Sequence, residues 1–331
     1  MPLKSASRTA WLLMAAAVIV LLLSIFIGRY PQPGLMDPFL LSTDTLAQRL
    51  VLNLRLPRII AALLLGASLG AAGSTLQTLF RNPLVEPGFL GVTQGAAFGA
   101  ALCILWLGTN PLVIELVAAA FAMLGLLLSA FIAHRLRYGG WVLRLLLAGI
   151  AVSALFSAGV GVLKYLADPL KELPEIVFWL LGGLYSVTWR DVLYLLPVVI
   201  PALAVLLLLR WRLNLLALGD ETAASLGVSV RRERAVMLTA AVAATAAVIA
   251  VAGVVGWVGL IVPQVARRWA GADTARSLPL SMGLGALFTL ICDDLARTLL
   301  PGELPLGILT SLIGALLFIL FLMTRTVKVA R

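Results

Sequence analysis

The feature that most constrains this chain is a succession of apolar segments separated by short stretches rich in Pro, Gly and charge. About 20 apolar residues span the hydrocarbon core of a membrane as a helix, and lipid offers no partner to an open strand edge. We therefore expect an all-α polytopic membrane protein. The segments lie at about 11–27, 58–79, 88–107, 111–133, 142–166, 190–209, 235–255, 256–266, 278–296 and 306–323.

The number of crossings depends on residues 235–266. As one helix this segment would be about 48 Å long at 1.5 Å per residue, which exceeds one crossing of about 30 Å, and Gly253 and Pro263 interrupt it. Ten crossings place most of the 25 basic residues on the side of the N-terminus, as the positive-inside rule requires. Nine would move Arg267 and Arg276 to the opposite side. We expect ten crossings with both termini cytoplasmic.

Ten crossings divide the single transmembrane domain, 1–331, into two five-helix halves, 1–174 and 175–331. An odd number of crossings per half inverts the second half relative to the first, which is the inverted repeat of many transporters. A short apolar stretch at 176–184 is too brief to span, so we expect a helix that dips in from one face. The first apolar segment lacks a small-residue cleavage site and is expected to be retained.

Composition excludes several other functions. The chain is 62% hydrophobic and only 12% charged, and its net charge of +10 is carried by basic residues in short loops. Basic residues in short loops between apolar segments indicate membrane orientation and not nucleic-acid binding. One histidine, His134, excludes a His-rich metal site, and Cys103 and Cys292 lie in apolar segments as packing residues. We expect no catalytic residue, no cofactor and no metal site, and hence no enzyme. The phosphate-binding motif GxxxxGK[ST] does not occur in the sequence, so any ATPase would be a separate polypeptide.

Two groups of small residues predict close helix packing. Spacings of three and four residues let neighbouring backbones approach in lipid. The groups are Gly66, Gly70 and Gly73, and Gly91, Gly95 and Gly99.

A polar stretch between residues 210 and 234 contains the sequence GDETAASLGV at 219–228. Asp220 and Glu221 suit the positive end of a helix dipole, and Gly227 is placed to end the helix. Ala224 and Leu226 contribute a small apolar face. A short cytoplasmic helix with an acidic start and an apolar face indicates a docking surface.

Several stretches, taken in order, resemble the permease subunits of the iron-chelate and vitamin B12 class of bacterial ABC importers, often called the FecCD family. They cover the chain from about residue 50 to its end. They are LRLPR at 54–58, RNPLVEPGFLGV at 81–92, LLAGIA at 146–151, WLLGGL at 179–184, GDETAASLGV at 219–228, GLIVP at 259–263 and ELPLG at 303–307.

The resemblance implies a two-fold dimer of ten-helix subunits in the bacterial inner membrane. A second copy of the chain, two ATPase subunits and a periplasmic or lipid-anchored substrate-binding protein are the implied partners. The helix at 219–228 matches the family's ATPase-coupling helix, through Gly219, Asp220, Glu221, Ala224, Leu226 and Gly227. The chain departs from the family at Gln264, where a histidine is common.

The resemblance also implies a role for three arginines on the outer side, where the family's permeases meet acids of the binding protein: Arg55, Arg58 and Arg297. The alternative is lipid contact or a local pair, because Asp293 lies four residues before Arg297 and Asp294 adjoins it. By the same resemblance, the fifth span and the following short helix line the path and form its gates, with candidate gate residues at Tyr165, Asp168, Lys171, Glu172 and Pro174. Solvated loop charges are the alternative there.

The expected substrate class is a metal chelate: a ferric siderophore, haem or cobalamin. An oxyanion such as molybdate remains an alternative substrate. A secondary transporter with inverted repeats, or a membrane protein without transport, remains an alternative function. Few titratable groups lie deep in the apolar segments, Glu115 among them, which argues against a proton-coupled carrier.

Overall fold

The computed structural model describes residues 17–324, and most of them are helical. The first described helix is Ala17–Phe26, and a two-stranded hairpin of β1 (Ile27–Gly28) and β2 (Gly34–Leu35) follows it. The remaining elements, in chain order, are α2 (Leu40–Thr43), α3 (Thr45–Leu50), the π-helical turn η1 (Val51–Arg55), α4 (Leu56–Leu79), the 3₁₀ turn η2 (Pro87–Leu90), α5 (Val92–Trp106), α6 (Pro111–Arg135), α7 (Trp141–Leu166), α8 (Glu172–Leu181), α9 (Trp189–Leu208), α10 (Arg210–Ala217), α11 (Asp220–Ser225), α12 (Val230–Ala252), α13 (Val258–Ala270), α14 (Thr274–Thr298) and α15 (Leu306–Thr324).

Seven of the described helices are long and apolar enough to cross a membrane. They are Thr45–Leu79, which joins α3, η1 and α4, and then α6, α7, α9, α12, α14 and α15. Two shorter apolar helices, Ala17–Phe26 and α5, occupy two of the other predicted spans, and the 13-residue helix α13 occupies the third. The all-α membrane architecture predicted from the apolar segments is thereby confirmed.

The predicted interruption of residues 235–266 is present between α12 and α13. Gly253 follows α12 with φ +68°, and Trp257 precedes α13 with φ +71°. The break packs against the end of α8: the N–H of Gly183 donates to the carbonyl oxygen of Ala252 (2.8 Å). A Cβ added at Gly253 would collide with the carbonyl oxygen of Trp179. Backbone contact this close requires glycine.

The glycine groups lie at helix crossings, as predicted. A Cβ at Gly66 would collide with the carbonyl oxygen of Gly285, and one at Gly73 with that of Gly259, so α4 contacts α14 and α13 backbone to backbone. Two hydroxyls reinforce the α4–α14 contact: Ser281 donates to Gly70 O (2.8 Å) and Thr289 to Ala62 O (2.7 Å). Small residues and interhelical hydrogen bonds hold such crossings together without a hydrophobic driving force.

Two predicted boundaries were wrong. The short helix α8 spans Glu172–Leu181 rather than 176–184, because Pro174 is tolerated in a first helical turn and Gly182, at φ +69°, ends the helix. The second span begins at Thr45, well before Pro57. The π-helical turn η1 directly precedes Pro57 and lets the helix continue without the hydrogen bond that proline cannot donate.

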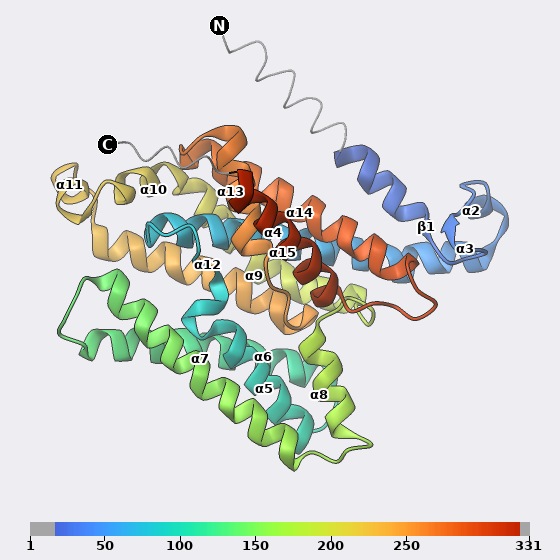
Figure 1. Cartoon of the computed structure of the whole chain (residues 1–331). Helices are drawn as coiled ribbons and strands as arrows, with labels where there is room; N and C mark the ends of the chain where they lie inside the picture. Colours follow the sequence, from blue (N-terminus) through green and yellow to red (C-terminus); the bar gives the residue numbers. More distant parts are fainter. Residues whose placement is uncertain (1–16, 325–331) are drawn as a thin grey trace, which may run out of the picture.

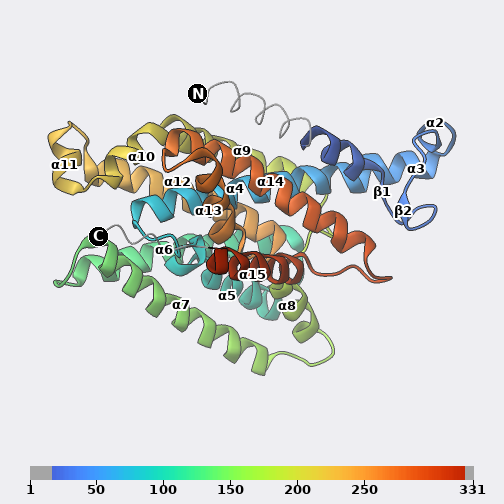
Figure 2. The ribbon, with the colours of Figure 1, turned by 45° about the horizontal axis from the view of Figure 1, so that its top comes forward.

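The bundle has two ends that carry different elements (Figures 1 and 2). One end, called here the α11 end, carries α11 and the turn between α6 and α7. The opposite end, called here the α3 end, carries the β-hairpin, α2 and α3, with α8 on the same side of the bundle. The predicted cytoplasmic helix and the predicted outer arginines therefore lie at opposite ends.

Candidate functional site

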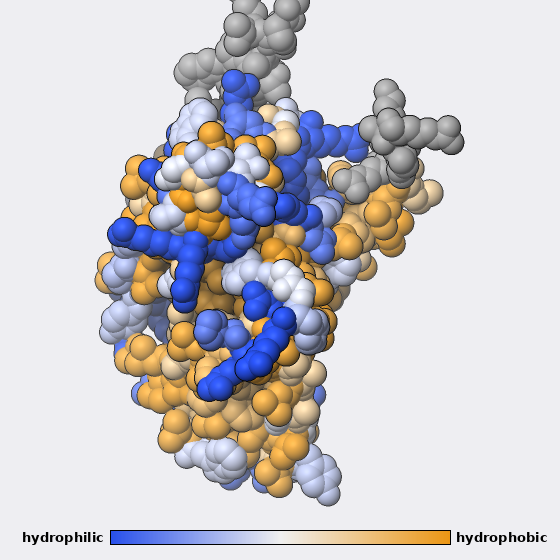
Figure 3. Space-filling view, turned by 90° about the vertical axis from the view of Figure 1, so that its left-hand side faces the viewer, coloured by the Kyte–Doolittle hydropathy of each residue, from blue (hydrophilic) through white to orange (hydrophobic). Residues whose placement is uncertain are grey.

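The helix α11 protrudes at the α11 end of the bundle, where hydrophilic side chains gather among apolar ones (Figure 3). It starts after Gly219, at φ +126°, and ends before Gly227, at φ +80°. Ala223 is fully buried, whereas Glu221, Ala224 and Leu226 are exposed. Leu226 presents 56% of its surface. The helix thus has an anchored face and a free face with apolar and acidic groups.

Asp220 fixes the start of α11. Its carboxylate accepts two hydrogen bonds from the guanidinium of Arg234 on α12, at 2.6 and 3.1 Å. Arg81 contributes a longer ion pair to the same carboxylate, at 3.9 Å. The hydrogen bonds from Arg234, with smaller Coulomb contributions from both arginines, lower the pKa of the Asp220 carboxyl below its usual range.

At the α3 end, Arg58 and Arg297 belong to a buried ionic cluster. The Arg58 Nε donates to both carboxylate oxygens of Asp293 (2.9 Å), and its Nη1 to Glu303 (2.7 Å). Arg297 pairs with Asp293 (3.4 Å) and with Asp294, and Ser24 donates to Asp294 (2.7 Å). The local Asp293–Arg297 pair is present, and α4 adds a second arginine that the spacing did not indicate.

Arg55 lies beside this cluster but differs from it. Its guanidinium donates to the backbone oxygen of Ile25 (2.8 Å), and no carboxylate of residues 17–324 forms an ion pair with it. Arg55, Arg58 and Arg297 are only 6–7% exposed. The three arginines predicted to meet the binding protein are therefore buried rather than exposed at the surface. All three nevertheless line a cavity of about 470 Å³, together with Arg29, Tyr30, Tyr185 and Glu303.

The predicted gate residues lie in and beside the turn between α7 and α8: Tyr165 ends α7 with Leu166, Asp168 and Lys171 stand in the turn, and Glu172 and Pro174 lie in the first turn of α8. Glu172 accepts a hydrogen bond from the Asp168 backbone N–H (2.9 Å), and the Asp168 carboxylate accepts one from Leu170 N–H (2.7 Å). These two acids therefore shape the turn, as solvated loop charges do. Tyr165 is 89% exposed and Lys171 is also exposed, so the turn presents free side chains beside α8.

Glu86 lies in the segment between α4 and α5, and the structure places it inside the bundle. The segment from 80 to 91 folds back into the bundle, so that Glu86 lines a cavity of about 260 Å³ with Leu69, Ser153 and Thr245 from the middle of α4, α7 and α12. Its carboxylate accepts the backbone N–H of Trp257, next to the start of α13. Thr93 and Gln94 add polar groups to this cavity.

Comparison with known proteins places this arrangement in a family. A model of the FecCD transport family matches residues 15–324. The chain belongs to the FecCD transport family. The molybdate import system permease protein MolB of Haemophilus influenzae is 38% identical over 309 residues, covering 91% of each chain. The Fe(3+) dicitrate transport system permease protein FecC of Escherichia coli is 40% identical over 314 residues, covering 92% of this chain and 94% of that one.

A solved structure shows the same fold for this FecCD-family chain. It describes an inward-facing conformation of a metal-chelate type ABC transporter and superposes with a TM-score of 0.89 at 37% identity. The superposition covers 96% of this chain and 100% of that chain. The chain is therefore a multi-pass membrane permease of the ABC importer type.

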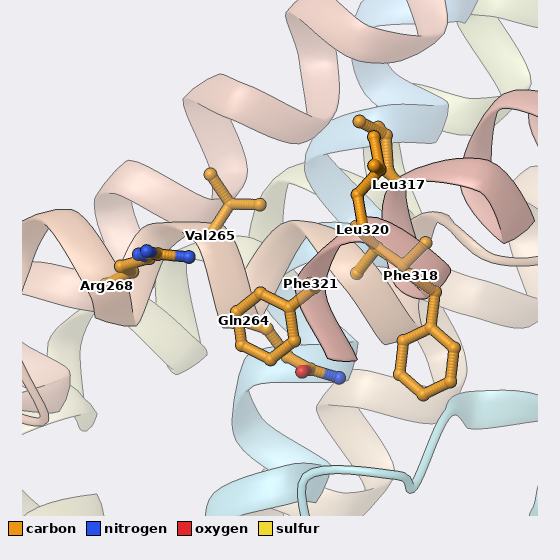
Figure 4. A pocket seen from close by; sticks show the side chains of 8 residues that line it. Gln264, Val265, Arg268, Leu317, Phe318, Leu320 and Phe321 are labelled. Carbon is orange, nitrogen blue, oxygen red and sulfur yellow. The ribbon is translucent and has the colours of Figure 1, made fainter. Parts of the chain in front are cut away.

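Gln264 is the position where this FecCD-family chain departs from the expected histidine. The Gln264 amide donates to Pro83 O (3.1 Å) and to Leu260 O (3.2 Å), so it ties α13 to the turn that follows α4. Its side chain borders a cavity of about 190 Å³, across which residues of α13 and α15 face one another (Figure 4). Since an amide cannot become charged, this link between α13 and residue 83 does not titrate.

Proposed function

We propose that this chain is the permease subunit of a bacterial ABC importer that carries a metal chelate into the cytoplasm. The observation that carries the proposal is the match to the FecCD family over residues 15–324, which takes in the membrane-spanning helices and α11 alike. An ATPase-coupling helix has to be held firmly by the permease and still expose a binding face. The buried Ala223, the Asp220–Arg234 pair and the exposed Ala224 and Leu226 meet both requirements.

The proposed assembly contains a second copy of the chain, two ATPase subunits at the α11 end and a substrate-binding protein at the α3 end. In this arrangement the subunit lies in the inner membrane of a bacterial cell, and its α11 end faces the cytoplasm. Ten helices per subunit cross the membrane, as two groups of five in inverted orientation. A cysteine at Thr109, in the turn between α5 and α6, should then react with an impermeant thiol reagent in intact cells. A cysteine at Ser225 should not; reaction at Ser225 alone would reverse the orientation.

The arginine cavity at the α3 end is the proposed docking site of the binding protein. A guanidinium fork binds a carboxylate in a bidentate manner and stays charged at every relevant pH. Arg58 and Arg297 already have carboxylate partners within the chain. Arg55 donates only to a backbone oxygen, so it is the guanidinium best able to pair with a carboxylate of the binding protein. Docking would also place acidic groups against Arg29, which lines the same cavity.

The proposed translocation path runs along α7 and α8, from the turn at Tyr165, Asp168, Lys171, Glu172 and Pro174 toward the cavity that holds Glu86. Exposed side chains on that turn and polar side chains in that cavity support this course. A polar chelate needs polar side chains along its path. Polar side chains are costly where they face lipid, so those inside the bundle mark a candidate path. Blocking a cysteine at Tyr165 with a bulky thiol reagent should stop uptake while leaving basal ATP hydrolysis in place.

The test of the function is reconstitution. The chain, its ATPase and its binding protein, in proteoliposomes, should accumulate a labelled ferric siderophore, haem or cobalamin only when ATP is present. Uptake of molybdate instead would favour the oxyanion alternative, which the 38% identity to MolB keeps open. Gradient-driven uptake by the chain alone would favour a secondary transporter, and the absence of flux with any substrate would contradict a transport role.

A further inference from the structure

The contacts around Asp220 extend well beyond α11 and form a continuous chain of four side chains. Arg234 binds Asp220 through the edge of its guanidinium, and the face of the same group lies over the ring of Trp141, with Cζ 4.6 Å from the ring centroid. The ring of Trp141 in turn stacks on Phe80, with centroids 5.4 Å apart and planes 30° apart. We call Asp220, Arg234, Trp141 and Phe80 the α11 relay.

The four members of the α11 relay stand on four different segments. Asp220 begins α11, Arg234 lies in the first turns of α12, Trp141 is the first residue of α7 and Phe80 follows the last residue of α4. Phe80 also leads into the turn that returns to Glu86. The relay therefore connects the proposed ATPase-docking helix with the start of the helix proposed to line the path and with the re-entrant segment.

Arg81 closes the chain of contacts from the other side. It donates to the carbonyl oxygen of Leu216 on α10 (3.3 Å) and lies 3.9 Å from Asp220. Two cavities, of about 580 and 600 Å³, flank the relay, and Trp141, Asp220 and Arg234 line both of them. The link between α11 and α7 is consequently a narrow bridge of side chains with open space on either side.

The chemistry of this bridge depends on arginine. Only 6% of the surface of Arg234 is exposed, and its guanidinium uses its edge and one face at the same time. A planar guanidinium can form a bidentate pair along its edge while stacking on an aromatic ring, whereas a lysine ammonium cannot do both. Any displacement of Asp220 must therefore carry the guanidinium with it and change its contact with Trp141.

We propose that Arg234 is a positioning residue that transmits movement of α11 to the first turn of α7 and to the segment after α4. The proposal rests on the proposed function, because it assigns to α11 the movement that the ATPase would impose. A purely structural role would require Arg234 only to hold α11 in place. The two roles differ in their dependence on Trp141, which contributes to the relay but does not touch the docking face of α11.

The test compares two substitutions of one residue. Trp141→Leu removes the aromatic face, whereas Trp141→Phe keeps a ring for both Arg234 and Phe80. In the reconstituted importer, Trp141→Leu should bind the ATPase with unchanged affinity but lower the substrate transported per ATP hydrolysed by about tenfold or more. Trp141→Phe should retain most of that ratio. An unchanged ratio in Trp141→Leu, or equal losses in the two variants, would overturn the relay.

A second measurement needs no transport. Spin labels at Ser225→Cys on α11 and Gly140→Cys before α7 should give a narrow distance distribution, which Trp141→Leu broadens and Trp141→Phe does not. Gly140 has open space around the position of a side chain, and the cysteines at 103 and 292 are buried. If the wild-type assembly showed no ATP-driven uptake, the proposed function would fail, and the spin-label distances would still decide the relay. Identical distance distributions in the protein with Trp141, in Trp141→Leu and in Trp141→Phe would contradict the α11 relay.

Discussion

The two ends of the bundle each hold an arginine–aspartate pair, and the two pairs are built differently. At the α3 end, Arg58, Arg297 and Asp293 are buried on all sides, and Asp293 is fully enclosed. At the α11 end, Arg234 is buried, but the side chain of Asp220 is 58% exposed and cavities lie on both sides. The first pair is suited to fixing helices and the second to moving with a partner.

The difference follows from what surrounds each pair. Glycines at the α4–α14 crossing bring the two backbones into contact, and the buried charges of Asp293, Arg58 and Arg297 are satisfied chiefly by one another. At the α11 end, short helices and turns leave gaps, so solvent screens the pair and its contribution to stability is small. The following predictions test this contrast, from the largest expected effect to the smallest.

The largest effect is expected for Asp293→Asn. The substitution removes the charge that Arg58 and Arg297 share and leaves two buried guanidiniums incompletely paired. Loss of one partner of a buried pair costs about 3–5 kcal/mol. The melting temperature of the purified chain in detergent should fall sharply, whereas Asp220→Asn should change it little. Equal, small shifts in both variants would remove the distinction between the two ends.

The next effect concerns the α4–α14 helix crossing. In Gly285→Ala, the new methyl group would collide with the carbonyl oxygen of Gly66, and overpacking of this kind costs about 1–3 kcal/mol. Gly283→Ala is the matched control on the same helix, because open space surrounds Gly283. It should be neutral or stabilise the helix by roughly 0.5–1 kcal/mol. Equal melting temperatures for the two variants would contradict the close α4–α14 contact.

Much of the fold follows from the sequence, because lipid restricts the backbone to helices and leaves length and apolarity as local signals. The break between α12 and α13 could be predicted from Gly253 and from the length of the segment. The bounds of α11 followed from Asp220 and Gly227. These features depend on residues close together in the chain, so no tertiary contact was needed to predict them.

The sites were less predictable, because they depend on contacts between distant segments. The spacing of Asp293 and Arg297 indicated a local pair, but Arg58 and Glu303 join it from other elements. The position of Glu86 inside the bundle depends on the return of residues 80–91 toward α4, α7 and α12, which are distant in the sequence. Gly91, left-handed at φ +81°, marks the return into α5. The stacking of Trp141 between Phe80 and Arg234 had no sequence signal.

A smaller effect is expected for docking at the α3 end. Arg55→Gln removes a guanidinium without leaving a buried carboxylate unpaired, unlike any change at Arg58. The binding protein should associate several-fold more slowly at low salt, and the difference should shrink at high salt as charges are screened. Arg49→Gln is the control, since Arg49 is exposed on α3 and does not line the cavity. Equal association rates in both variants at low salt would refute docking at Arg55.

The smallest effect is the pH dependence of the α11 anchor. The pKa of the Asp220 carboxyl is lowered below its usual range, chiefly by hydrogen bonds from Arg234. A carboxyl with a depressed pKa contributes stability above its unfolded pKa and loses it as pH falls through the folded value. The anchor should therefore be unchanged between pH 7 and pH 5 and should weaken only below about pH 4. Because the Asp220 side chain is exposed, solvent screens the pair, and its contribution to stability should be less than about 1 kcal/mol.

This prediction can be measured from the mobility of a spin label at Ser225→Cys. In the otherwise wild-type chain the label should be equally restrained at pH 7 and pH 5 and should gain mobility only below about pH 4. With Asp220→Asn the label should be mobile at all three pH values, because the amide cannot form the charged pair. Loosening of α11 already between pH 7 and pH 5 would show that a group other than Asp220 controls the anchor. The partly exposed Asp220–Arg234 pair would then no longer account for the difference between the α11 end and the buried cluster at the α3 end.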